Sequence, residues 1–115
     1  SIEYENETFQ HLGSVVTNNG YSDWATTAID ASVKSMWYRF SRREDDYCIE
    51  CSADGENFSQ MRVCHMHEGG GKIRFGVLHI RLEQRLSFVV HGLGAGRRGS
   101  IIFLAGCAQQ ERQQK

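Results

Sequence analysis

The fold of this chain is indicated best by one stretch, Gly13-Ser-Val-Val-Thr-Asn-Asn-Gly-Tyr-Ser-Asp-Trp24. Its first half holds β-branched residues, which favour a strand, and the pair Asn19-Gly20 favours a tight turn with positive φ. A polar triplet, Tyr21-Ser-Asp23, follows, and the next residue is Trp24. The stretch therefore predicts a strand that turns sharply, with Trp24 at the surface.

Strand-forming segments continue on both sides of this stretch, with turn residues between them. Ile2–Glu5 and His11–Thr17 are expected to form a hairpin around residues 5–8. Further strands are expected at 24–31, 35–41, 47–52, 58–64 and 72–78, with Asp54-Gly55 as the turn between 47–52 and 58–64. No segment up to residue 78 holds a helical period. Short strands at regular spacing predict an all-β antiparallel sandwich.

The chain changes character after residue 78. Residues 1–78 are expected to form the β domain, and residues 79–108 an atypical segment in which Arg81–Leu86 fits a helical turn or a strand equally. Residues 109–115 are polar and predict a disordered tail. The charge changes too, from five basic and twelve acidic groups in 1–71 to eight and two in 72–115. This asymmetry indicates a basic tail with an acidic partner, or two segments of different origin.

The bulk composition excludes several classes of protein. A chain of 115 residues has room for one domain, and a net charge of −1 argues against binding to nucleic acid or to a membrane surface. No apolar run approaches the ~20 residues of a spanning helix. The acidic first residues lack the order of a signal peptide, and four uneven cysteines are too few for a disulfide scaffold, so a cytoplasmic protein is expected. No cofactor is expected, because Gly92-x-Gly-x-Gly96 lacks the context of a dinucleotide loop.

Several spaced motifs follow one another in an order that a known family shares. They are Glu3, Ser14-Val-Val-Thr17, Tyr21-Ser-Asp-Trp24, Trp37-x-Arg39, Ser52-x-Asp54-Gly55, Met61-Arg62 and Gly76-Val77. Over about residues 3–77 the chain resembles a family of uncharacterised domains that includes the regulation-of-enolase protein. The resemblance implies a concanavalin A-like jelly roll, in which two curved antiparallel sheets pack face to face. The family name also implies a metabolic enzyme as a partner.

The chain departs from this family pattern in two places. The pattern begins well before its Glu3 motif, so the resemblance implies a partial jelly roll with its N-terminal strands missing. Sheet edges left exposed in this way predict a homo-oligomer. After Gly76-Val77 the pattern continues with serine-proline, whereas this chain reads Leu78-His-Ile-Arg-Leu-Glu83 and contains no proline. Translation of residues 79–115 out of frame is one explanation, and an ordinary divergent C-terminus is the other.

Three alternating carboxylates near the start suggest an enzyme as one alternative function. On an unbroken strand Glu3, Glu5 and Glu7 would share one face, at a spacing that suits the nucleophile and acid of a glycoside-active enzyme. The competing interpretation places residues 5–8 in a solvated hairpin turn. The carboxylate motif of glucanases is also not matched. The alternative therefore rests on Glu3 with a second acid, and no catalytic residue is assigned. A further alternative is an inactive fragment of a larger domain, because the N-terminal strands of the family pattern are missing.

The cysteines and histidines imitate a zinc site. Cys48-x2-Cys51 and Cys64-His65-x-His67 have ligand-like spacing. On a strand, however, cysteines three residues apart point to opposite faces, and no glycine follows until Gly55. Half-buried thiols are the expected state, and no metal ligand is assigned.

The strongest candidate for function is a set of aromatic and polar residues suited to binding a sugar. An aromatic face stacks on a sugar ring, and planar polar side chains hold its hydroxyls. The candidate ligand-binding residues are Thr17, Tyr21, Asp23, Trp24, Trp37, Arg39 and Arg62. The expected function is a non-enzymatic binding or regulatory module that recognises a carbohydrate or small metabolite on its concave face. The competing interpretation is that the tryptophans fill the sheet and that Trp37 and Arg39 stack on each other.

Overall fold

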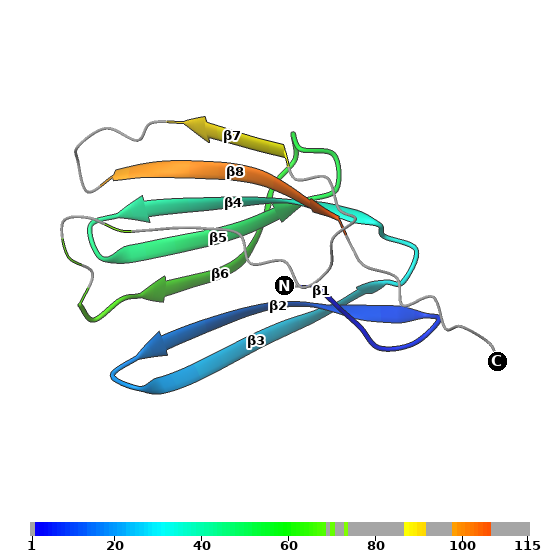
Figure 1. Cartoon of the computed structure of the whole chain (residues 1–115), viewed down its shortest axis with the longest axis horizontal. Coiled ribbons are helices and arrows are strands. Elements are labelled where there is room, and N and C mark those ends of the chain that lie inside the picture. Colours follow the sequence, from blue (N-terminus) through cyan, green and yellow to red (C-terminus); the bar gives the residue numbers. More distant parts are fainter. Residues whose placement is uncertain (1, 69, 71–72, 74–86, 92–97, 107–115) are drawn as a thin grey trace.

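The computed structural model describes residues 2–68, 70, 73, 87–91 and 98–106. Within these residues the only regular secondary structure is β-strand, and the strands form two antiparallel sheets. Figure 1 shows the three-stranded sheet below the five-stranded sheet. The predicted all-β fold is confirmed as a partial β-sandwich.

The three-stranded sheet has the order β1-β2-β3. Its strands are β1 (Ile2–Tyr4), β2 (Phe9–Asn18) and β3 (Tyr21–Asp30). Asn19 and Gly20 have φ of 52° and 79°, so they form the predicted tight turn between β2 and β3. Pairing runs without a shift from Asn18 opposite Tyr21 to Phe9 opposite Asp30. The polar triplet that was expected to follow the strand therefore begins the next one.

The five-stranded sheet has the order β6-β5-β4-β8-β7. Its strands are β4 (Ser35–Arg43), β5 (Asp46–Ser52), β6 (Ser59–His65), β7 (Ser87–His91) and β8 (Arg98–Gly106). The predicted Asp54-Gly55 turn joins β5 to β6, with Gly55 at φ 79°. The segment 79–108, whose structure the sequence left open, contributes β7 and β8. The strand expected at 72–78, the segment Arg81–Leu86 and the tail 109–115 lie outside the described residues, apart from residue 73.

The core lies where β2 meets β4. Leu12, Met36 and Tyr38 are buried together. Partly buried side chains pack around them, namely Ile2, Ile29, Val33, Cys51 and Met61. Because alternate residues of a strand point to opposite faces, the inward Met36 and Tyr38 place Trp37 and Arg39 on the other face of β4. We call this the outer face of the five-stranded sheet.

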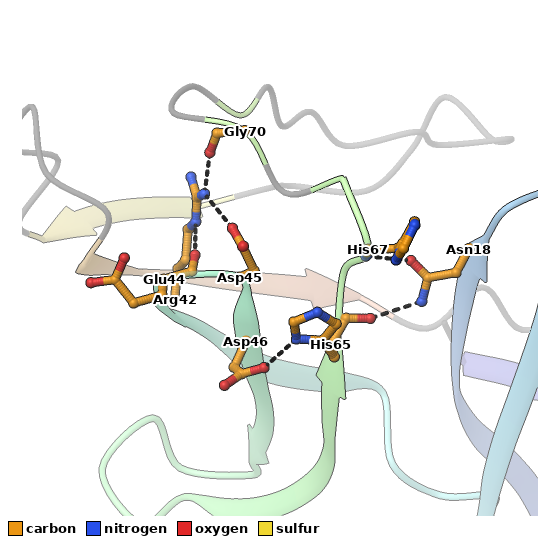
Figure 2. A network of polar contacts seen from close by, with 8 residues as sticks. All are labelled: Asn18, Arg42, Glu44, Asp45, Asp46, His65, His67 and Gly70. Carbon is orange, nitrogen blue, oxygen red and sulfur yellow. Dashed lines mark hydrogen bonds and ion pairs between the residues drawn. The ribbon is translucent and has the colours of Figure 1, made fainter.

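Polar contacts hold the two sheets together beside β6. The Arg62 guanidinium donates to the Asp23 carboxylate at 2.7 Å and to the Asp23 backbone oxygen at 3.2 Å. The Asn18 side chain donates to the His65 backbone oxygen and accepts from the His67 N–H, both at 2.8 Å (Figure 2). The end of the β2–β3 hairpin is therefore fixed to β6 by side chains rather than by a shared strand ladder.

Candidate functional site

The seven candidate ligand-binding residues lie on three different surfaces of the protein. Thr17 and Trp24 share the outer face of the three-stranded sheet, because Thr17 is opposite Ser22 and Trp24 is opposite Val15. Trp24 is 54 % exposed, which confirms the expected surface position. The Thr17 and Ser22 hydroxyls form a hydrogen bond of 2.8 Å with each other.

Asp23 and Arg62 are brought together between the sheets. Asp23 is opposite the buried Val16, so it points toward the five-stranded sheet, where it meets Arg62. The Arg62 side chain is 14 % exposed, whereas that of Asp23 is 74 % exposed. Tyr21 points to the same side of β3 as Asp23 but is 83 % exposed. The Asp23–Arg62 pair already has a structural role in joining the sheets.

Trp37 and Arg39 form the third group, on the outer face of the five-stranded sheet. Arg39 lies opposite Glu50 of β5. Its Nε donates to Glu50 Oε2 at 2.6 Å and its Nη2 donates to Glu50 Oε1 at 2.7 Å, a two-pronged ion pair. The Phe58 ring covers one face of the guanidinium, with Cζ 4.2 Å from the ring centroid. Arg39 is therefore held in one orientation by two neighbours.

The ion pair shifts the pKa of both partners in the direction that keeps them charged. The two hydrogen bonds between Arg39 and Glu50 lower the pKa of Glu50 and raise the pKa of Arg39. Desolvation of each side chain opposes its shift. Both groups therefore remain charged at neutral pH. The side chains stay 32 % and 18 % exposed, so a ligand in solution can reach them. The two hydrogen bonds to Glu50 use Nε and Nη2 of Arg39, and within the described residues no acceptor lies in hydrogen-bonding reach of Nη1.

Trp37 is fixed beside this ion pair by the β5–β6 turn. A Cβ atom added to Gly55 would lie 3.0 Å from Cε2 and Nε1 of the Trp37 indole, so the turn backbone rests on the ring. The turn is itself held by Asp54, whose carboxylate accepts from Asn57, Glu56 and Ser52. These hydrogen bonds, with that from the Asn57 side chain the largest, lower the pKa of Asp54. Trp37 is consequently half-buried, and only part of its ring is open to a ligand.

The acidic residues proposed for the enzyme alternative do not form a continuous row. β1 ends at Tyr4, so the turn interpretation of residues 5–8 is confirmed. Glu3 lies opposite His11, and the exposed Glu5 contacts the His11 Nδ1 at 3.0 Å. The result is a solvent-facing cluster at the edge of the three-stranded sheet.

The cysteines take the half-buried positions that the sequence predicted. Cys51 packs on the core, whereas Cys48 lies opposite Val63 on the outer face of the five-stranded sheet. Desolvation raises the pKa of both thiols, so they stay protonated. The His65 Nδ1 lies 2.7 Å from Asp46 Oδ1. The Asn18 side chain bonds to the backbone of both His65 and His67 (Figure 2). Within the described residues no group of three or more histidine, cysteine or acidic side chains is placed to hold a metal ion.

A second polar network fixes the β4–β5 turn, as Figure 2 also shows. Arg42 donates to the Glu44 backbone oxygen at 2.6 Å and to the Gly70 backbone oxygen, and it lies 3.7 Å from the Asp45 carboxylate. The Arg42 side chain is 8 % exposed. This arginine is therefore committed to the turn and is unsuited to hold a ligand.

These features define the chain as an all-β domain of two antiparallel sheets that carries a rigid arginine–carboxylate pair on one outer face. The family model for "Protein of unknown function (DUF1349)" matches residues 1–84, and the chain belongs to that family. Strands β7 and β8 lie beyond the matched residues. Neither a curated protein nor a solved structure matches the chain. The described residues include no helix that is long and apolar enough to cross a membrane.

Proposed function

We propose that the outer face of the five-stranded sheet binds a small polyhydroxylated ligand, a carbohydrate or a related metabolite, without chemical turnover. The observation that carries the proposal is the Arg39–Glu50 pair, which is rigid, charged and partly exposed. Nη1 of Arg39 supplies a directed donor, and a Glu50 oxygen supplies an acceptor, so together they match neighbouring hydroxyls of a sugar.

The surroundings of this pair favour a ring-shaped ligand. Phe58 provides apolar surface over one face of the guanidinium, and Trp37, two residues along β4 on the same face of the sheet, leaves part of its ring open. A sugar ring offers an apolar face and polar edges, so it fits a site of this composition better than a flat anion does. The site residues come from β4, β5 and the β5–β6 turn, whose positions are fixed by the strand ladder.

Finer parts of the proposal rest on the family resemblance and on composition. They are a concanavalin A-like form of the sandwich, a metabolic enzyme as a protein partner, and a cytoplasmic location. Association with such an enzyme is an equal variant of the proposed binding function.

A glycan array probed with the labelled chain tests the proposal, followed by titration of any sugar that binds. We expect Arg39→Lys to weaken binding about tenfold or more, because lysine keeps the charge but loses the planar fork. Trp24→Ala is the comparison, since it removes an aromatic ring from the other sheet, and its affinity is read from titration of a single sugar unit, which does not depend on dimer formation. Loss of binding in Trp24→Ala but not in Arg39→Lys would place the site elsewhere, and no binding by the parent chain would refute the proposal. Circular dichroism of each variant checks that it is folded.

A further inference from the structure

β3 is a long edge strand that is exposed on both of its faces. Along its whole length it pairs with β2, and no other strand in the described part of the chain pairs with it. Every residue of β3 is exposed except Ile29, which is partly buried. Figure 1 shows β3 at the lower border of the molecule. Its outer edge is therefore open to another strand.

The register identifies the backbone groups on this open edge. In a two-residue hairpin the residues that flank the turn, here Asn18 and Tyr21, form a hydrogen-bonded pair. Hydrogen-bonded pairs then alternate along the ladder, so Tyr21, Asp23 and the later odd-numbered residues bond to β2. The N–H and C=O groups of the even-numbered residues point outward, and these are Ser22, Trp24, Thr26, Ala28 and Asp30.

This edge has few of the features by which proteins prevent strand addition: its charged residues are Asp23, which is bound by Arg62, and Asp30 at its end. β3 contains no lysine, arginine or proline, and its pairing with β2 has no bulge. β6, in contrast, has a register shift against β5 between Ile49 and Glu50 and carries Arg62 and His65. The other two edge strands, β1 and β7, are only three and five residues long, against ten for β3. Among these edges, β3 is the one suited to extended pairing.

We propose that β3 pairs antiparallel with β3 of a second copy of this chain, with the two-fold axis at Ala25. This register sets outward-pointing residues against each other, so Trp24 bonds to Thr26 of the second copy and Ser22 to Ala28. It also keeps each face of the sheet continuous, because paired residues lie on the same face. The two three-stranded sheets then form one sheet with three strands from each copy.

The side chains of β3 complement one another in this register. Tyr21, which is 83 % exposed, lies opposite Ile29 of the second copy, and Trp24 lies opposite Thr26. Aromatic and β-branched residues are favourable cross-strand partners. Asp23 lies opposite Thr27 of the second copy, and its carboxylate is bound by Arg62 of its own chain at 2.7 Å. No pair of like charges therefore opposes the association, which distinguishes a second copy from an unrelated acidic strand.

Sedimentation velocity over a range of concentrations tests the association of the full chain. We expect a reversible dimer whose dissociation constant rises about tenfold or more in Thr26→Pro, because proline removes an outward N–H. The ladder with β2 does not use that N–H, so circular dichroism should remain that of the parent. Thr26→Ala is the control and should still dimerise. A monomer at every concentration, a polydisperse aggregate, or a dimer unaffected by Thr26→Pro would each overturn the proposal.

A cysteine pair tests the register. Ala25 faces its own copy across the axis in a pair without hydrogen bonds, where Cα atoms are about 4.5 Å apart, a distance that a disulfide can span. Ala25→Cys should therefore cross-link the dimer in oxidised glutathione. Ala28→Cys, which lies far from the axis, should cross-link no more than the parent chain with its native cysteines. Equal cross-linking of the two variants would overturn the proposed register.

Discussion

Replacement of Gly55 by alanine tests whether the β5–β6 turn holds Trp37 in place. Gly55 has φ 79°, and an added Cβ would lie 3.0 Å from two atoms of the Trp37 ring. Gly20 has the same φ, but an added Cβ there meets nothing within 4 Å. The two glycines thus form a matched pair in which backbone strain is shared and contact with the ring is not.

The magnitudes follow from these two contributions. The left-handed conformation costs an L-residue about 1–2 kcal/mol, so Gly20→Ala should lower the free energy of unfolding by that amount. Gly55→Ala bears the same cost, and it also overpacks the ring, which adds about 1–3 kcal/mol. Urea denaturation followed by tryptophan fluorescence and by circular dichroism measures both variants against the parent.

The comparison has a clear point of failure. If Gly55→Ala costs no more than Gly20→Ala, the turn does not rest on Trp37, and the rigidity claimed for the candidate site is wrong. A double-mutant cycle with Trp37→Leu strengthens the test. The excess cost of Gly55→Ala should shrink in that background, because the smaller side chain leaves room for the added methyl group.

Two further predictions concern polar contacts. Because Arg39 lowers the pKa of Glu50, the pair stabilises the fold above the ordinary carboxyl pKa, and that contribution is lost as the pH falls through the lowered value. Arg39→Met should therefore destabilise the protein more at neutral pH than at a pH low enough to protonate Glu50, where only its contact with Phe58 is lost, and an equal effect at both in urea titrations would contradict the pairing. Asn18→Ala should cost about 1–2 kcal/mol by removing two hydrogen bonds between the sheets. Asn18→Asp keeps the acceptor for His67 and should cost less, so equal losses for the two variants would contradict the contact.

Much of the fold could be predicted from the sequence because its signals are local. Asn19, Gly20 and Gly55 have residue types that tolerate positive φ, and the turns at Asn19-Gly20 and Asp54-Gly55 both form as predicted. The strand expected at 35–41 forms as β4, and the period of two along any strand separates Met36 and Tyr38 from Trp37 and Arg39. The alternation of side chains along a strand does not predict the order of the strands in a sheet. The insertion of β8 between β4 and β7 depends on pairing between distant segments, for which the sequence carries no local signal.

The candidate site was predicted less well for a related reason. Asp23 and Trp24 are neighbours in the motif, but consecutive residues of a strand point to opposite faces, so the two side chains lie on different surfaces of the sheet. Glu50 and Phe58, which position Arg39, were missed because their pairing depends on the β4–β5 register. The turn at Glu44 with φ 57° sets that register and brings Arg39 opposite Glu50. The acidic pair Glu44-Asp45 between two strand segments was the available signal.

The two proposals concern different sheets, and this separation has a functional consequence. Pairing through β3 extends the three-stranded sheet, whereas Arg39 and Glu50 lie on the outer face of the five-stranded sheet. A dimer of the proposed form therefore leaves both ligand sites open and fixes their distance and direction relative to each other. Two sites held in this way bind a repeating ligand more tightly than one site does, because the second contact is made within the same complex. Weak binding at each Arg39–Glu50 pair is then compatible with tight binding to a polymer of sugar units.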